Sequence, residues 1–198
     1  MYKKVNKLNE NHLRILELFT RGYNRDFYIR EIEKILSISP RTVQLILRNL
    51  EKKSILKSET RGKIRVYKIN QSFISREYLL LTENYKKIAF FEKNIIIKEV
   101  IEKIESHIDG ISLIFGSYAK GTYKKDSDLD IFVAGSYKKN EINKISNLYN
   151  IEINIKQYDL TAFENNLHKD IFLREILDNH IIIKGTEEFL GMMVRWIK

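Results

Sequence analysis

The chain has 198 residues, of which 43% are hydrophobic and 31% charged, and its formal net charge is +9. This hydrophobic content is enough for a packed core and excludes collagen-like, low-complexity and disordered proteins. The absence of cysteine excludes disulfides, thiolate nucleophiles and thiolate metal sites. No apolar run approaches the ~18 residues that span a membrane, and Met1–Lys4 does not open a signal peptide. We therefore expect a cytoplasmic protein without a membrane partner.

The excess of positive over negative charge is confined to the first 75 residues. Residues 1–75 hold 17 Lys and Arg against 7 acidic residues, whereas residues 76–198 hold 18 against 19. This asymmetry predicts two modules with different partners, and a polyanion is the expected partner of the first. A solvated basic surface without such a partner is the alternative.

A helix-turn-helix pattern occupies the first part of the sequence. Amphipathic spacing predicts a helix over about 12–19, a short extended segment at 27–30 and a second helix to about residue 36. Ser39 and Pro40 then mark the start of a third helix, as its N-cap and its first helical residue. The third helix buries one apolar face and leaves polar side chains pointing outward, among them Arg41, Thr42, Gln44 and Arg48.

Two β-like runs follow at 54–58 and 64–69, and the Gly-containing segment 59–63 joins them as a hairpin. This order of elements resembles the winged helix-turn-helix domains of prokaryotic transcription regulators, over about residues 8–70. The resemblance implies double-stranded DNA as the partner, with the third helix in the major groove. The hairpin would bring cations to phosphates or the minor groove: Arg61, Lys63 and Arg65. A winged helix that binds only another protein is the alternative.

Residues 73–94 have the pattern of a connecting helix, with apolar clusters at 78–81 and 88–91. Such clusters usually pack within or between domains. A homodimer contact is a further use, since winged-helix regulators commonly bind two half-sites.

The residues that carry chemistry follow a predicted strand at 111–115, which ends in Gly116-Ser117. Ten residues later, Asp128 and Asp130 stand two positions apart at the start of the next predicted strand. Strand alternation puts both carboxylates on one face, where they repel each other unless a cation lies between them. Mg²⁺ suits such a pair when substrate phosphates complete its coordination.

Three residues around the first strand end could bind those phosphates. Gly116 allows close backbone approach, Ser117 adds an N–H and a hydroxyl, and Lys120 could neutralise the charge of a polyphosphate. Gly-Ser, ten residues and Asp-x-Asp together resemble the signature of the polymerase-β-type nucleotidyltransferase superfamily, and more closely the minimal nucleotidyltransferases of bacteria and archaea, over roughly 95–185. The resemblance implies that Gly-Ser binds a nucleoside triphosphate, ATP or another, and that the Asp pair binds metal ions. A polar loop between two core strands is the alternative.

The family pattern includes a third carboxylate on a neighbouring strand, which shares a metal ion and helps to deprotonate the acceptor. Residues 150–156 are the candidate strand, and alternation puts Glu152 and Asn154 on its polar face. Glu152 is the expected third ligand and base, although the family usually has aspartate here. If the strand register brings Asn154 to this position instead, the metal site is incomplete and catalysis is in doubt.

The expected fold is α+β, with helices at 160–167 and 170–177, a strand at 180–184 and a last helix to residue 196 completing the second module. We predict three parts: a winged helix-turn-helix DNA-binding domain (1–72), a helical connector (73–94) and a small α/β minimal nucleotidyltransferase domain with a mixed sheet (95–198).

The resemblance implies a Mg²⁺-dependent enzyme that transfers a nucleoside monophosphate from the triphosphate to a protein or RNA hydroxyl. Minimal nucleotidyltransferases often pair with HEPN-type toxins as antitoxins that adenylylate the toxin, so such a toxin is one possible partner and autoregulation of transcription one possible role. The alternative is a transcriptional regulator whose nucleotidyltransferase fold senses a nucleotide, or binds a partner, without turnover.

Overall fold

The computed structural model describes residues 8–197, so the ends of the expected domain ranges, 1–7 and 198, lie outside the described residues. The described residues form two compact units, one comprising 8–82 with Ile197 and the other 83–196. The helix α4 (Phe73–Lys93) occupies the expected connector. None of the helices within 8–197 combines the length and apolar character needed to cross a membrane.

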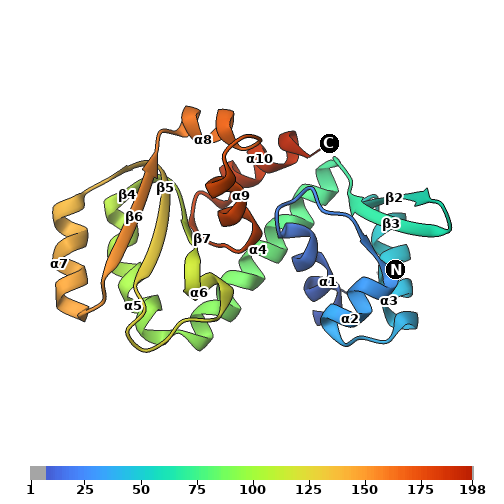
Figure 1. The fold of residues 1–198 in the computed structure, drawn as a ribbon, viewed down its shortest axis with the longest axis horizontal. Coiled ribbons are helices and arrows are strands. Elements are labelled where there is room, and N and C mark those ends of the chain that lie inside the picture. Colours follow the sequence, from blue (N-terminus) through green and yellow to red (C-terminus); the bar gives the residue numbers. More distant parts are fainter. Residues whose placement is uncertain (1–7, 198) are drawn as a thin grey trace, which may run out of the picture. The chain divides into compact units, whose positions relative to one another are not determined.

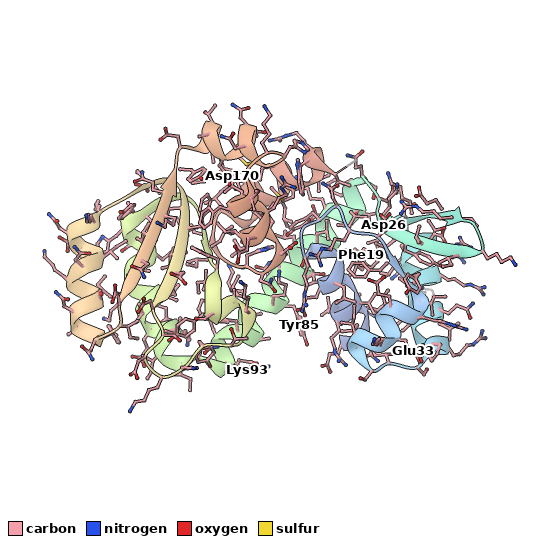
Figure 2. The ribbon with its side chains drawn as sticks, viewed as in Figure 1. Phe19, Asp26, Glu33, Tyr85, Lys93 and Asp170 are labelled. Atoms are coloured by element: carbon pink, nitrogen blue, oxygen red, sulfur yellow. The ribbon has the colours of Figure 1, made fainter. Side chains whose placement is uncertain are left out.

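The first unit consists of α1 (Glu10–Thr20), β1 (Phe27–Tyr28), α2 (Ile29–Leu36), α3 (Pro40–Lys52) and the hairpin strands β2 (Leu56–Arg61) and β3 (Ile64–Ile69). Both β1 and β2 pair antiparallel with β3. Ser39 caps α3 by accepting a hydrogen bond from the backbone N–H of Thr42, as a serine before a helix-initiating proline should. Phe19, labelled in Figure 2, packs edge-to-face on Phe27 at a centroid distance of 5.1 Å, which joins β1 to the helical core.

The second unit contains a four-stranded sheet and its helices (Figure 1). Its elements are α5 (Ile95–Ile104), a 3₁₀ turn (Glu105–His107), β4 (Ile108–Ile114), α6 (Gly116–Lys120), β5 (Leu129–Tyr137), α7 (Lys139–Tyr149), β6 (Ile153–Tyr158), α8 (Leu160–Asn166), α9 (Ile171–Asp178), β7 (Ile181–Lys184) and α10 (Thr186–Trp196). The strand order is β6-β5-β4-β7, with only β5 and β6 parallel. The α+β class and the mixed sheet are as predicted.

The side chains of β5 point to two faces of this sheet, one packed against aliphatic residues and the other against aromatic rings. Leu129, Ile131 and Val133 are fully buried in one apolar cluster with α5 and α7. On the opposite face Phe132 contacts aromatic rings of β6 and α8. Since side chains alternate along a strand, Asp130 lies on the face of Phe132, at the end of the sheet where β5 begins.

The segment between the Gly-Ser and Asp-x-Asp motifs contains a helix that the sequence analysis did not predict. The chain forms the short helix α6, which ends at Gly121 in the left-handed conformation. Tyr118 is buried, and its ring stacks on that of Tyr123 at 4.4 Å. Burying this ring stabilises an ordered turn that composition alone does not reveal.

Candidate active site

The Gly-Ser corner and the two aspartates meet where β4 ends and β5 begins. The backbone N–H of Phe115 donates to the carbonyl of Asp130 at 3.0 Å, so Gly116 follows directly beside this aspartate. A Cβ atom at Gly116 would collide with the Asp130 carboxylate, and the backbone φ there is +69°. Glycine is therefore required at this position for both contact and conformation.

The two aspartates form an electrostatically unfavourable pair. Burial and the neighbouring charge of Asp128 raise the pKa of Asp130, against a hydrogen bond from Asn154 and the more distant charge of Lys156. Asp128 itself is exposed. Two neighbouring carboxylates, one of them partly desolvated, favour a bound cation. This arrangement is expected of a ligand-binding site rather than of a pair that only stabilises the fold.

The position next to the pair is occupied by an amide. In the parallel ladder of β5 and β6, Asp130 lies opposite Asn154. The Nδ2 of Asn154 donates to Oδ2 of Asp128 at 3.2 Å. Of the two registers that the sequence allowed, the structure has the one that presents Asn154 to the aspartates.

Glu152, expected as third ligand and base, precedes β6. Its carbonyl accepts a hydrogen bond from the N–H of Leu129 at 2.8 Å, and its side chain is exposed. Among residues 8–197, no three His, Asp or Glu side chains come together as a group that could hold a metal ion. Within the described residues Glu152 does not complete such a group with Asp128 and Asp130, and the side chain that hydrogen-bonds to Asp128 is the amide of Asn154.

The expected phosphate-binding residues lie on α6. Gly116 and Ser117 begin the helix, while Lys120 lies in its last turn. The Nζ of Lys120 pairs with Oε1 of Glu175 on α9 at 2.8 Å, and both side chains are exposed. An exposed ion pair of this kind contributes little to stability, so Lys120 can exchange Glu175 for a phosphate at small cost.

A cavity of about 1260 Å³ opens beside Asp128. The start of α5, the stacked rings of Tyr118 and Tyr123 and the end of α7 line it, and Glu152 faces it as well. No sequence motif pointed to this cavity, because its walls come from segments that only the fold brings together.

The candidate DNA-contacting residues fall into two groups within the first unit. On α3, Arg41 and Arg48 are exposed, and Thr42 and Gln44 are half-buried. Arg41 donates to Gln44 at 3.2 Å, and the N–H of Thr42 is bound by the cap residue Ser39.

The hairpin cations are different, because acids of the same unit already neutralise two of them. Nη2 of Arg65 donates to both carboxylate oxygens of Glu51 on α3, at 2.7 and 2.8 Å. Arg61 pairs with Asp26 and Glu59. Lys63 is exposed next to the turn. Formal charge along the hairpin therefore overstates the charge available to a polyanion.

Comparison with known proteins agrees with the geometry of the second unit. The model of the nucleotidyltransferase domain family matches residues 93–194, just over half of the chain, and the protein belongs to this family. Its Asp pair and Gly-Ser corner lie within the matched region.

A curated relative adds a narrower similarity. Over 83 residues, 41% of this chain, the sequence is 35% identical to "Putative protein adenylyltransferase MJ1547" of Methanocaldococcus jannaschii. The chain spans 60% of that protein's length. No solved structure matches the chain.

Proposed function

We propose that the second unit transfers a nucleoside monophosphate from a nucleoside triphosphate to an acceptor hydroxyl, with pyrophosphate as the leaving group. The observation that carries this proposal is the meeting of a Gly-Ser corner with Asp128 and Asp130, where burial and the charge of Asp128 raise the pKa of Asp130. Family membership supports the same reaction class.

The residues present suit a divalent cation delivered with the triphosphate. Two carboxylates offer hard anionic oxygens, and Mg²⁺ typically takes one or two such ligands together with substrate phosphates and water. When bound, the ion would polarise the α-phosphoryl group and stabilise the charge that develops during transfer. Asp128 and Asp130 would hold the ion, Gly116 and Ser117 would receive the phosphates at the start of α6, and Lys120 would offset their charge.

The proposed acceptor is a protein hydroxyl, and ATP is the proposed donor. The name of the M. jannaschii relative describes a protein adenylyltransferase. The charges that line the cavity beside Asp128 are Lys93, Lys125, Asp126, Asp128 and Glu152. Because acids outnumber bases there, the cavity attracts a polyanionic RNA end less than it attracts a protein segment.

The experiment is a transfer assay with α-phosphate-labelled ATP, Mg²⁺ and separate protein and RNA fractions of a bacterial lysate. We expect label in protease-sensitive material, lost in Asp128→Asn and retained in Asp109→Asn, which makes the same change on an exposed residue of β4. Nucleotide binding without transfer to either fraction would contradict the proposal, and label in RNA alone would contradict the protein acceptor.

A second function is favoured for the first unit. We propose that it is a winged helix-turn-helix that binds double-stranded DNA through α3, on the observation that Arg41 and Arg48 are exposed on that helix within the basic part of the chain. The order of three helices and an antiparallel hairpin supports this reading. Lys63 would add a phosphate contact from the hairpin.

A salt-dependent DNA-binding assay tests this second proposal. Arg41→Ala with Arg48→Ala should weaken binding and flatten the slope of log affinity against log salt by up to about two units, one for each lost phosphate contact. Lys138→Ala with Lys139→Ala removes the same charge from the other unit and should leave binding unchanged. Equal affinities for all three proteins would overturn α3 as the DNA-contacting helix.

A further inference from the structure

Asn154 presents a neutral hydrogen-bond donor to Asp128, at the edge of the sheet where the proposed metal ligands lie. Its position is fixed by two backbone features: the register of β5 and β6 sets Asn154 opposite Asp130, and the N–H of Leu129 bonds to the carbonyl of Glu152. Bringing Glu152 opposite Asp130 would take a slip of two residues, which would break the ladder that runs from Leu129 to Ala134. Asn154 therefore does not exchange places with Glu152 while the sheet is intact.

The orientation of the Asn154 amide satisfies the aspartates in place of a cation. Its Nδ2 donates to Oδ2 of Asp128 at 3.2 Å, and the pairing of β5 with β6 places Asn154 opposite Asp130. An amide has one neutral oxygen, whereas a carboxylate has two oxygens that share a full negative charge. Even if the amide turned its oxygen inward, it would add no charge to balance a second metal ion.

The balance of charge limits the number of cations that the site can hold. Asp128 and Asp130 supply two negative charges, and Lys156, two residues after Asn154 on β6, adds a positive charge on the same face of the strand. Across residues 8–197, no third acidic side chain joins the pair as a metal-binding group. One divalent ion would neutralise the two aspartates. A second ion would have almost only the triphosphate to balance its charge.

Resting on the proposed function, we infer that the site of this chain holds a single divalent cation together with the nucleotide, and that Asn154 excludes the second ion of a two-metal arrangement. The cation would lie between the two aspartates and the phosphates. Replacing Asn154 by aspartate would supply the missing charge and two oxygens, so that a second cation would follow.

Equilibrium dialysis with Mn²⁺ and a non-hydrolysable ATP analogue tests this inference by counting ions, independently of activity. With the analogue saturating, we expect one protein-dependent Mn²⁺ per chain in the native protein and two in Asn154→Asp. Asn140→Asp, which adds the same charge to an exposed position of α7, should stay at one. Thermal unfolding of each variant checks that it is folded.

The outcomes separate this inference from the proposed function. Two ions in the native protein, or one ion in a folded Asn154→Asp variant, would overturn the inference. If Asn154→Asp does not fold, the count for the native protein still decides. Mn²⁺ binding that is unchanged by Asp128→Asn would instead overturn the proposed function, since the ion would then lie elsewhere.

Discussion

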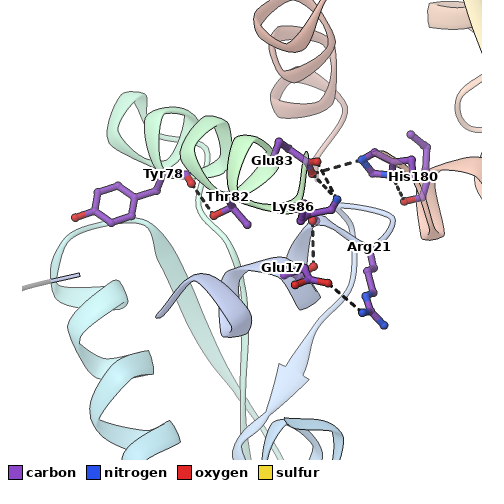
Figure 3. Close-up of polar contacts among 9 residues, drawn as sticks. Glu17, Arg21, Tyr78, Thr82, Glu83, Lys86 and His180 are labelled. Carbon is purple, nitrogen blue, oxygen red and sulfur yellow. Dashed lines mark hydrogen bonds and ion pairs between the residues drawn. The ribbon is translucent and has the colours of Figure 1, made fainter. Parts of the chain in front are cut away.

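The second unit has two carboxylates, the buried Glu83 and the half-buried Asp130, whose pKa values shift in opposite directions. Glu83 on α4 is fully buried, but its side chain accepts from Nζ of Lys86 at 2.8 Å and lies 3.4 Å from Nε2 of His180 (Figure 3). Burial alone would favour the neutral acid, but these two neighbours hold the pKa of Glu83 far below its usual value. At Asp130, burial and a second carboxylate raise the pKa instead.

The contrast distinguishes a structural charge from a functional one. The Glu83 carboxylate is balanced by its neighbours within the protein, whereas the aspartate pair has only the amide of Asn154 and the charge of Lys156, and a bound cation would stabilise it further. Burial and Lys86 also lower the pKa of His180, so its imidazole is neutral at pH 7. Lys86 therefore supplies most of the positive charge that stabilises the Glu83 carboxylate. A raised carboxyl pKa beside a second acid is therefore the more informative signal of a ligand site.

The largest expected effect is at the aspartate pair. Asp128→Ala or Asp130→Ala should lower nucleotidyl transfer by a factor on the order of 10³, because each removes a carboxylate that would hold the cation against the reacting phosphate. Initial rates with labelled ATP measure this effect. Far-UV circular dichroism should show no change of fold, and a loss of less than about tenfold would remove the pair from the mechanism.

A change at Gly116 should act on the same site through shape. Gly116→Ala places a Cβ against the Asp130 carboxylate and imposes a side chain at φ +69°, so we expect nucleotide affinity to fall by about 10². Gly62→Ala, at φ +62° but with open space around it, is the control for backbone strain. Isothermal titration with an ATP analogue measures both, and equal affinities would contradict the close approach.

The buried network should show its effect in stability. Glu83→Ala leaves Lys86 without this carboxylate in a desolvated site, so the free energy of unfolding should fall by about 3 kcal/mol. Because the pKa of Glu83 is lowered on folding, its contribution is present above the normal Glu pKa of about 4.3 and is lost as the pH falls through the lower folded value. Urea denaturation between pH 3 and about pH 7 checks this, and a difference that grows toward acid would contradict the assignment.

The smallest expected effect has the opposite sign. Asp130→Asn should raise the melting temperature slightly at neutral pH, by about 1–3 °C, because ionisation of Asp130 beside Asp128 costs stability. The pKa of Asp130 is raised on folding, so this cost is absent below the normal Asp pKa and appears as the pH rises through the folded value. Scanning calorimetry at two pH values measures it. Asp109→Asn should cause no shift, and a destabilised Asp130→Asn protein would contradict the repulsion.

Local signals in the sequence predicted most elements of both units, but neither α6 nor α7. The Ser39-Pro40 start of α3, the helix at the connector and the strand that begins after Asp128 follow from capping, periodicity and alternation. The Gly-Ser and Asp-x-Asp motifs also gave the correct neighbourhood, because the hairpin-like pairing of β4 with β5 brings their two ends together.

Local signals in the sequence did not predict the contacts between distant segments. Alternation puts Glu152 and Asn154 on the same face of the strand, so the sequence alone does not say which of them lies opposite Asp130. The pairing of β6 with β5 decides it. The pairs of Lys120 with Glu175 and of Glu83 with His180 join residues far apart in the sequence. No spacing rule connects them, so His180 offered no sign of its partner.

The central claim is that Asp128 and Asp130 hold a divalent cation together with a nucleoside triphosphate at the Gly-Ser corner. A crystal structure with Mn²⁺ and a non-hydrolysable ATP analogue tests it directly through the anomalous signal of manganese. We predict a manganese peak between the two carboxylates, with the triphosphate beside Gly116 and Ser117. A nucleotide bound at this corner without a manganese peak, or a manganese peak away from both aspartates, would contradict the account.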